Sequence, residues 1–258
     1  MRMAVPLLER RHVPKKQRLD QLLVERGLAP SRAKAQALVM AGLVYSGARR
    51  LAKAGEALAP DAPLEVRGAP PPYVSRGGVK LAAALDGFAI DPAGLVALDI
   101  GASTGGFTDV LLQRGARRVY AVDVGYGQLD ARLRADPRVV VRERTNARHL
   151  SPAEVPEPVD LVVCDASFIS LHLVLPAALG LARSGAALVA LIKPQFEAGR
   201  GEVGKGGVVR DPAVHARVCA EVRHWLEGAG WAVLGVIASP LTGPAGNREF
   251  LIAARRPR

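Results

Sequence analysis

Cysteine is scarce in this chain of 258 residues, which contains only Cys164 and Cys219. Two thiols are too few for a disulfide framework or for a zinc site built from cysteines, so we expect a reducing compartment, the cytoplasm. His215 and Cys219 stand four residues apart, but no third metal ligand accompanies them. We therefore expect no bound metal and interpret both side chains as packing or surface residues.

Long apolar runs are also missing. The uncharged run at residues 166–182 contains serine, histidine, proline and glycine, and it is shorter than the ~20 apolar residues that a membrane-spanning helix needs. The apolar run at residues 4–8 is too short for the core of a secretory signal peptide. These absences predict a soluble chain that is neither secreted nor embedded in a membrane.

Positive charge is in excess, because 35 lysines and arginines stand against 24 acidic residues, a net charge of +11. Residues 1–72 hold 13 basic and 6 acidic side chains, a net of +7, whereas the other 186 residues hold 22 and 18, a net of +4. Such an excess favours a polyanionic partner, with nucleic acid as the first candidate. Since the excess is concentrated at the front of the chain, we expect the contact there.

A compact basic module is predicted over residues 18–66. Leucines lie on one helical face from residue 19 to a stop at Gly27, and a second helix is expected from the N-cap Ser31 to Gly42, followed by a hairpin. Its lysines and arginines could simply form a face exposed to solvent, but the excess of positive over negative charge in so small a module favours contacts with phosphates. The predicted RNA-binding residues are Arg18, Arg32, Lys34, Arg49, Arg50 and Lys53.

Three consecutive prolines in RGAPPPY predict a stiff, extended linker at residues 67–73, and residues 1–17 form an extension ahead of the basic module. Over residues 74–258, apolar segments alternate with segments of helical length. Continuous apolarity predicts strands buried on both faces, hence a doubly wound α/β domain with a parallel sheet, behind a small α+β module. The last two apolar segments are close in sequence, so we expect the final strand to pair antiparallel.

The segment ALDIGASTGGFTDVLL, residues 97–112, passes from an apolar run through a glycine cluster into a second apolar run. Glycines between a strand and a helix let a ligand approach the backbone, although an ordinary strand-to-helix turn gives the same pattern. Gly101 and Gly106 hold the outer positions of the dinucleotide motif, but Ser103 replaces the middle glycine that a pyrophosphate requires. This predicts a nucleotide-like ligand without phosphates, such as S-adenosylmethionine.

Charged residues end four of the apolar strand candidates, namely Asp99, Asp123, Asp165 and Lys193. The carboxyl ends of parallel strands share one edge of the sheet, where ligands collect, and an unpartnered charge there is costly. Asp123 lies 22 residues after Gly101, near the spacing of an acid that binds a ribose diol. We interpret it as the adenosine anchor, with a helix N-cap as the alternative.

Two further charged residues are expected at the same edge. A final strand that runs backwards brings Glu249 there, and Lys80 in SRGGVKL can reach it through the helix that it starts. A partly desolvated lysine beside another positive charge loses its proton more readily, and a neutral amine can act as a general base. Two lysines with two acids therefore form a plausible set for removing the proton of a sugar hydroxyl, although the sequence does not show that the four meet.

From about Arg18 onward the chain resembles the TlyA family, bacterial ribosomal RNA 2′-O-methyltransferases that are also labelled hemolysins and whose catalytic domain is related to FtsJ-like methyltransferases. The segments that carry the resemblance are YVSRGGVKL, DIGASTGGFTDVLL, AVDVGYGQL, RTNAR, CDASFIS, IKPQFE, GGVVRDP and SPLTGPAGNREF. Residues 18–66 resemble the αL RNA-binding motif that a ribosomal protein, pseudouridine synthases and tyrosyl-tRNA synthetases share. The resemblance implies a Rossmann-like methyltransferase fold for residues 74–258.

The resemblance also implies S-adenosylmethionine-dependent methylation of a cytidine 2′-OH in ribosomal RNA, with the ribosomal subunit as partner. We expect the enzyme to be a monomer. The resemblance implies catalytic roles for Lys80, Asp165, Lys193 and Glu249. The implied cofactor site comprises Asp99, Gly101, Ala102, Ser103, Gly105, Gly106, Phe107, Asp123 and Val124. Longer family members continue into a further helix and modify both subunits. Here only residues 256–258 follow the last strand candidate, so we expect modification of the large subunit alone, with both subunits as the alternative.

Other functions fit the sequence less well. GRGEVGKGG, residues 199–207, almost fits a phosphate-binding loop, but Gly206 replaces the hydroxyl residue that holds Mg²⁺, so we interpret it as a substrate-covering or merely flexible loop. Ser103 and the basic module disfavour an NAD-linked oxidoreductase. A non-catalytic RNA-binding factor has no need of four charged strand ends. A membrane-lytic protein requires a long apolar or amphipathic segment, which we do not find.

Overall fold

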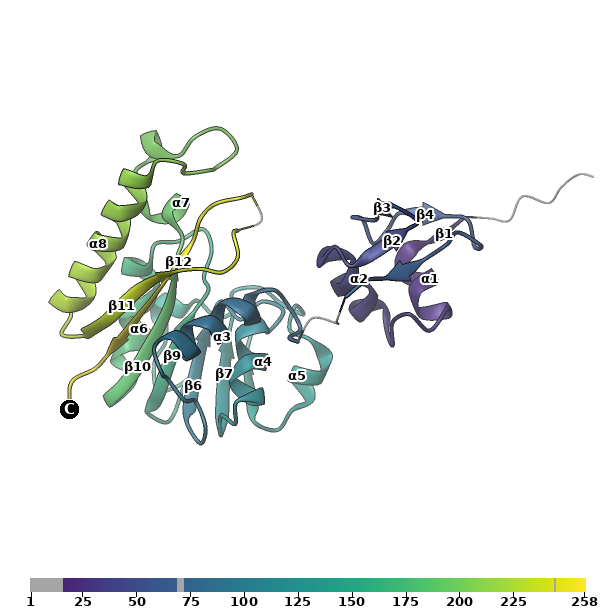
Figure 1. Cartoon of the computed structure of the whole chain (residues 1–258). Helices are drawn as coiled ribbons and strands as arrows, with labels where there is room; N and C mark the ends of the chain where they lie inside the picture. Colours follow the sequence, from purple (N-terminus) through teal and green to yellow (C-terminus); the bar gives the residue numbers. More distant parts are fainter. Residues whose placement is uncertain (1–15, 69–71, 244) are drawn as a thin grey trace, which may run out of the picture. The chain divides into compact units, whose positions relative to one another are not determined.

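The computed structural model describes residues 16–68, 72–243 and 245–258, and it divides the chain into two compact units, Met1–Pro71 and Pro72–Arg258 (Figure 1). The division falls inside the linker predicted at residues 67–73. Most of the predicted N-terminal extension, residues 1–15, lies outside the described residues. No helix in the described ranges is long and apolar enough to span a bilayer.

The first unit packs two helices against short strands. Helix α1 (Leu19–Glu25) is followed by α2 (Arg32–Met40), which begins as predicted after Ser31, whose Oγ accepts a hydrogen bond of 3.3 Å from the Lys34 backbone N–H. The strands are β1 (Gln17–Arg18) paired with β4 (Ala57–Leu58), and β2 (Val44–Ser46) between β3 (Arg49–Arg50) and β5 (Glu65–Val66). Leucines of both helices form its own small core, so this unit buries apolar surface independently of the second.

The second unit is built on a seven-stranded sheet of order β11-β12-β10-β9-β6-β7-β8 (Figure 1). Its strands are β6 (Val96–Ile100), β7 (Arg118–Val122), β8 (Val139–Arg142), β9 (Val159–Cys164), β10 (Ala182–Ile192), β11 (Ala232–Ala238) and β12 (Phe250–Arg255). Strand β12 lies antiparallel between β10 and β11, whereas the other neighbours pair in parallel. The predicted antiparallel final strand is therefore confirmed.

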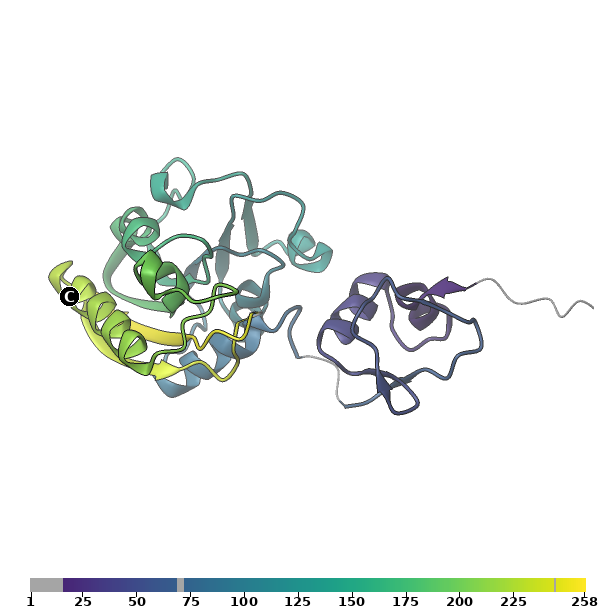
Figure 2. The same ribbon diagram turned by 90° about the horizontal axis from the view of Figure 1, so that it is seen from above.

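Helices cover both faces of this sheet, as continuous strand apolarity predicts (Figures 1 and 2). One core contains Leu98 of β6 and side chains of the helices on one face, and the other contains the preceding residue, Ala97, and side chains of the opposite face. The first face carries α6 (Leu171–Gly180) and α8 (Pro212–Gly228), and the second carries α3 (Gly77–Gly87), α4 (Gly106–Gln113) and α5 (Ala131–Ala135). Short turns complete the unit at η1 (Ala147–His149), α7 (Pro194–Glu197) and η2 (Arg200–Glu202).

Candidate functional site

Three of the predicted charged strand ends lie where the sequence places them. Asp123 follows β7, Asp165 follows β9 and Lys193 follows β10 directly. Glu249 precedes β12, whose antiparallel direction brings its first residue opposite Ile192, the last residue of β10. All four side chains therefore belong to the same edge of the sheet, the one at which the parallel strands end.

Lys193 and Asp165 form an ion pair at this edge. The Lys193 Nζ lies 2.7 Å from Asp165 Oδ1 and also donates hydrogen bonds to Ser167 Oγ at 2.7 Å and to the Asp165 backbone carbonyl at 3.1 Å. The lysine side chain is 8% exposed and the Asp165 side chain 23%. A nearly buried amine with all its partners on one loop has a fixed position, whereas the carboxylate beside it still reaches solvent.

Lys80 and Glu249 form a second, more deeply buried ion pair. The Nζ of Lys80, in α3, donates to Glu249 Oε2 at 2.5 Å, and the two side chains are 10% and 2% exposed. Gly243 makes room for this carboxylate, because a Cβ at that position would lie only 2.6 Å from Glu249 Oε1. Two charges this far from water are held only as a pair, since either one alone would carry the full cost of desolvation.

The first turn of α3 connects the two ion pairs. A Cβ on Gly77 would lie 3.5 Å from Asp165 Oδ2, so the start of the helix that carries Lys80 packs against the carboxylate that holds Lys193. The structure thus brings the predicted Lys80, Asp165, Lys193 and Glu249 together as two neighbouring pairs whose formal charges cancel. Their catalytic role stays a prediction.

A cavity of about 330 Å³ opens at this edge and is lined by Gly101, Ser103, Asp123, Val124 and Asp165 among others. Its size is that of a small-molecule pocket. The Asp123 carboxylate is oriented by two backbone donors, Ser103 N at 2.8 Å to Oδ2 and Gly125 N at 2.7 Å to Oδ1. Each oxygen keeps further acceptor capacity for hydroxyl groups of a ligand.

Sequence reasoning missed part of this cavity. Thr145, Asn146 and Ala147 line it, and they follow β8, the one parallel strand whose end was not examined for polar residues. The strand-end rule could have found them, since RTNAR stands at the same edge as the other strand ends. Phe168 also lines the cavity with its side chain 89% exposed, an unusual exposure for a phenylalanine and one that only the structure reveals.

Asp99 does not lie at a strand end, so that prediction was wrong. It is the fourth residue of β6, has no exposed surface, and accepts a hydrogen bond of 2.7 Å from Thr108 Oγ1. It does not line the cavity. Burial raises the pKa of the Asp99 carboxyl to about 7, and the bond from Thr108 opposes this rise only in part.

The raised pKa of Asp99 makes stability depend on pH. The folded state binds the Asp99 proton more tightly than the unfolded chain does, whose carboxyl titrates near 3.8. The protonated carboxyl therefore contributes to the free energy of unfolding in full below pH 3.8, and this stabilisation is lost as pH rises through about 7. The loss is up to roughly 4 kcal/mol. We expect Asp99→Asn to abolish this decline in denaturant titrations between pH 4 and 8, whereas the exposed control Asp91→Asn follows the wild type. A parallel decline in Asp99→Asn would contradict the assignment.

The glycines of the loop serve packing more than ligand approach. Gly101 has a φ of +78°, and a Cβ there would lie 3.0 Å from the backbone N of Ala166; a Cβ on Gly106 would lie 2.2 Å from Ser75 Oγ. The first glycine lets β6 end against the neighbouring strand's loop, and the second lets α4 approach α3. Among the other predicted cofactor residues, Ala102, Gly105, Gly106 and Phe107 do not line the cavity, and Ala102 and Phe107 belong to the core.

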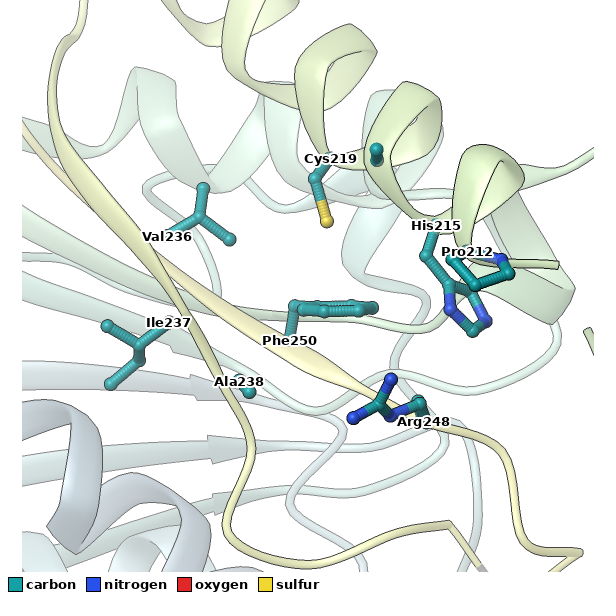
Figure 3. Close-up of a pocket in the computed structure, with 9 residues that line it drawn as sticks. Pro212, His215, Cys219, Val236, Ile237, Ala238, Arg248 and Phe250 are labelled. Atoms are coloured by element: carbon teal, nitrogen blue, oxygen red, sulfur yellow. The ribbon is translucent and has the colours of Figure 1, made fainter. Parts of the chain in front are cut away.

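A second cavity of about 380 Å³ lies between α8 and strands β11 and β12 (Figure 3). His215 and Cys219 project from α8 toward Phe250, and the His215 ring lies 5.6 Å from that ring. His215 is buried and Cys219 half-buried, which fits their interpretation as packing or surface residues. Burial raises the pKa of the Cys219 thiol to about 11, so it stays protonated at neutral pH.

In the first unit, Arg18 and Arg32 converge on one buried carboxylate. Asp20 accepts hydrogen bonds of 3.0 Å from both arginines and from Gln36, and the bond from Arg18 holds the pKa of Asp20 well below its usual range. The arginine side chains remain about half exposed, 48% and 54%. One negative charge fixes two guanidinium groups and leaves a net positive charge at the surface.

The other predicted RNA-binding cations are distributed over the same unit. Arg49 pairs with Glu56 at 2.6 Å, whereas Arg50 and Lys53 are exposed and Lys34 is partly buried. An exposed pair such as Arg49–Glu56 is worth little in water, so its arginine can exchange the carboxylate for a phosphate at small cost. The phosphate contacts themselves stay a prediction.

The sheet order, its single antiparallel insertion and the cavity at the ends of its parallel strands define the second unit as a Rossmann-like methyltransferase domain. The family model for FtsJ-like methyltransferases matches residues 73–256, and that for the S4 domain matches residues 17–61. The two matches thus correspond to the two units of the chain.

The chain belongs to the TlyA family of FtsJ-like methyltransferases. It is 52% identical over 239 residues, 92% of this chain and 89% of the relative, to the 16S/23S rRNA (cytidine-2′-O)-methyltransferase TlyA of Mycobacterium tuberculosis. It is 34% identical to the 23S rRNA (cytidine-2′-O)-methyltransferase TlyA of Campylobacter jejuni, over 69% of each chain. A solved structure described as "Putative hemolysin from Streptococcus thermophilus" is 43% identical with a TM-score of 0.75, over 94% of this chain and 89% of that one.

Proposed function

We propose that this protein transfers a methyl group from S-adenosylmethionine to the 2′-OH of a cytidine in ribosomal RNA. The observation that carries the proposal is the pair of lysine–carboxylate contacts at one edge of the sheet, where Asp165 of one pair lines a cavity that also presents an oriented acid, Asp123. The names of the two TlyA relatives support both the ribose hydroxyl and the cytidine. We also propose that the enzyme acts in the cytoplasm, where ribosomal RNA is assembled into subunits, and that it acts as a monomer.

The cavity residues fit S-adenosylmethionine. Asp123 would hold the ribose diol through both carboxylate oxygens. The two backbone hydrogen bonds fix the orientation of the carboxylate, and each oxygen retains a lone pair that can accept from a ribose hydroxyl. The apolar side chains of Val124 and Phe168, 71% and 89% exposed, would cover flat parts of the ligand. When bound, the cofactor supplies an electrophilic methyl group on a sulfonium centre.

The two ion pairs would hold the attacking hydroxyl and accept its proton. Transfer of the methyl group to the ribose oxygen would require the hydroxyl proton to leave, and the residues of these pairs stand where it could be received. Lys193 is our candidate for the proton acceptor, because its Nζ stands beside Asp165, which lines the cavity. The ion-paired ammonium has no free lone pair, so Lys193 accepts the hydroxyl proton only after it has released one of its own to solvent. The Lys80–Glu249 pair is formally neutral and would fix α3 beside Asp165.

Asp123→Ala should weaken S-adenosylmethionine binding on the order of a hundredfold, because the two hydrogen bonds from the diol to an ionised acceptor are lost. We expect the turnover number at saturating cofactor to change far less. Isothermal titration calorimetry with S-adenosylmethionine checks the affinity, and Glu221→Ala, an exposed acid on α8, serves as the matched control. Unchanged cofactor affinity in Asp123→Ala would contradict its assignment as the adenosine anchor.

The choice of ribosomal subunit is the finer part of the proposal. The M. tuberculosis relative is named for both 16S and 23S RNA, and the C. jejuni relative for 23S RNA alone. We propose a large-subunit cytidine as the principal target, with both subunits as the alternative. The deciding experiment incubates isolated large and small subunits with labelled S-adenosylmethionine and maps ribose methylation by primer extension. Failure to label either subunit would refute the proposed function.

A further inference from the structure

Asn247 is a buried polar residue that the proposed chemistry does not use. It is 2% exposed and stands two residues before Glu249. Its Nδ2 donates to the Gly207 backbone carbonyl at 2.8 Å, and its Oδ1 accepts from the Val209 backbone N–H at 3.0 Å. Both ends of the side-chain amide therefore bind one short segment, about forty residues earlier in the chain.

That segment is a tight hairpin in the glycine-rich stretch. Gly204 and Val208 form an antiparallel bridge, with Gly204 N donating to Val208 O at 3.1 Å, and Gly206 and Gly207 take positive φ angles of 82° and 74°. Lys205 lies at the turn with its side chain exposed. The turn therefore presents a cation to solvent on a backbone whose shape the glycines permit.

The hairpin is attached at its base to two further elements. The Val209 carbonyl lies 3.0 Å from His215 Nε2, in the first turns of α8, and the Asn247 backbone carbonyl accepts from Gly243 N at 2.9 Å. Gly243 is the residue that makes room for the Glu249 carboxylate. A continuous set of contacts thus runs from the Lys205 hairpin through Asn247 to the loop that holds Glu249 beside Lys80.

We propose that Asn247 is a positioning residue that fixes the hairpin at residues 204–208 at the catalytic edge, so that Lys205 contacts a phosphate of the bound RNA. The inference rests on the proposed function. Without the amide, the hairpin keeps its own backbone bonds and the contact of His215 with the Val209 carbonyl, but it loses both side-chain bonds, at Gly207 and at Val209. Because its residues 204–207 are exposed, we expect it to open more readily. The positive charge would then no longer be presented at a defined place.

A double-mutant cycle tests the proposal with large ribosomal subunits as the probe. Lys205→Ala should raise the subunit KM about fivefold and lower the slope of log affinity against log salt by about 1. Asn247→Ala should raise KM about tenfold, and the double variant should be no worse than Asn247→Ala alone, since Lys205 is then already misplaced. Multiplied effects, about fiftyfold in the double variant, would overturn the proposal.

Two controls separate positioning from loss of fold. S-adenosylmethionine affinity should stay within about twofold in every variant. Asn247→Asp, which keeps an acceptor for Val209 N but sets a carboxylate oxygen against the Gly207 carbonyl in place of the donor, should show the same non-additivity with Lys205→Ala. Arg223→Ala, an exposed cation on α8 paired with Glu227, should leave the subunit KM unchanged. If Arg223→Ala raised KM as much as Lys205→Ala, the loss would reflect the overall positive charge of the protein and not a specific contact of Lys205, which would overturn the proposal.

The attachment of the hairpin by Asn247 can also be measured without RNA. Trypsin should cleave after Lys205 about tenfold faster in Asn247→Ala than in the wild type, because cleavage requires the hairpin to open. Equal cleavage rates would show that Asn247 does not hold the hairpin. If the wild-type chain methylates no subunit, the proposed function fails, yet the cleavage rates still decide whether Asn247 holds the hairpin.

Discussion

Lys193→Ala should lower the turnover number by about a thousandfold while S-adenosylmethionine affinity changes by less than about twofold. The side chain is assigned to the RNA hydroxyl and has no contact with the oriented acid Asp123, so the cofactor site should survive its removal. Because Lys193 is held by Ser167 and Asp165, its loss leaves a carboxylate without a counter-ion at the place where the proton departs.

Lys193→Arg distinguishes a proton acceptor from a simple positive charge. Arginine keeps the charge but cannot lose its proton at ordinary pH, so we expect it to be almost as inactive as alanine. Single-turnover methylation of large subunits with saturating cofactor gives the rate, and calorimetry gives the affinity. Near-normal turnover of either variant would show that Lys193 is not the proton acceptor. The variants Lys80→Ala and Asp165→Asn would then test Lys80 and the Asp165 carboxylate for that role.

Removing the first unit should lower affinity for ribosomal subunits on the order of a hundredfold at moderate salt. A chain of residues 72–258 retains both large cores and the complete cavity, whereas the S4 unit has a separate small core, so the truncated protein should fold and bind S-adenosylmethionine normally. The loss follows from charge, since phosphate contacts by lysine and arginine dominate the affinity of nucleic-acid-binding proteins and release counterions.

Filter binding at several salt concentrations checks this prediction. The slope of log affinity against log salt should become shallower in the truncated chain, by about one for each phosphate contact that is lost. The full-length triple variant Arg49→Ala, Arg50→Ala, Lys53→Ala is the matched control: it keeps the unit and removes only exposed charge, and it should lose part of both affinity and slope. Equal slopes for full-length and truncated protein would show that the basic unit does not carry the phosphate contacts.

Local sequence patterns were sufficient for the organisation of the chain. Continuous apolar runs predicted a sheet covered on both faces, because a strand without a polar face has to be buried on both sides. The charged residues after β7, β9 and β10 were predicted to share an edge, since parallel strands all end on the same side. The helix after Ser31 and the antiparallel strand β12 followed from cap and loop-length rules that act over a few residues.

Asp99 shows where such rules stop. A carboxylate after four apolar residues looks like a strand end in the sequence, but the strand continues by one residue and its neighbours bury the side chain completely. Burial is set by the strands and helices packed on both sides, which lie far away in sequence. The same holds for Gly101 and Gly106, whose missing side chains are required by the backbone of Ala166 and the hydroxyl of Ser75.

By itself, the sequence determined the two-part organisation, the parallel sheet and the residue types at its edge, because each of these depends on periodicity, charge and direction along short segments. Only the tertiary structure decided which charges are partners. Lys80 and Glu249 are 169 positions apart, and their contact depends on how α3 packs and on the register of β12. Asn247 and the Lys205 hairpin are joined in the same way, since a hydrogen bond requires angstrom-scale placement that only packing of distant elements can set.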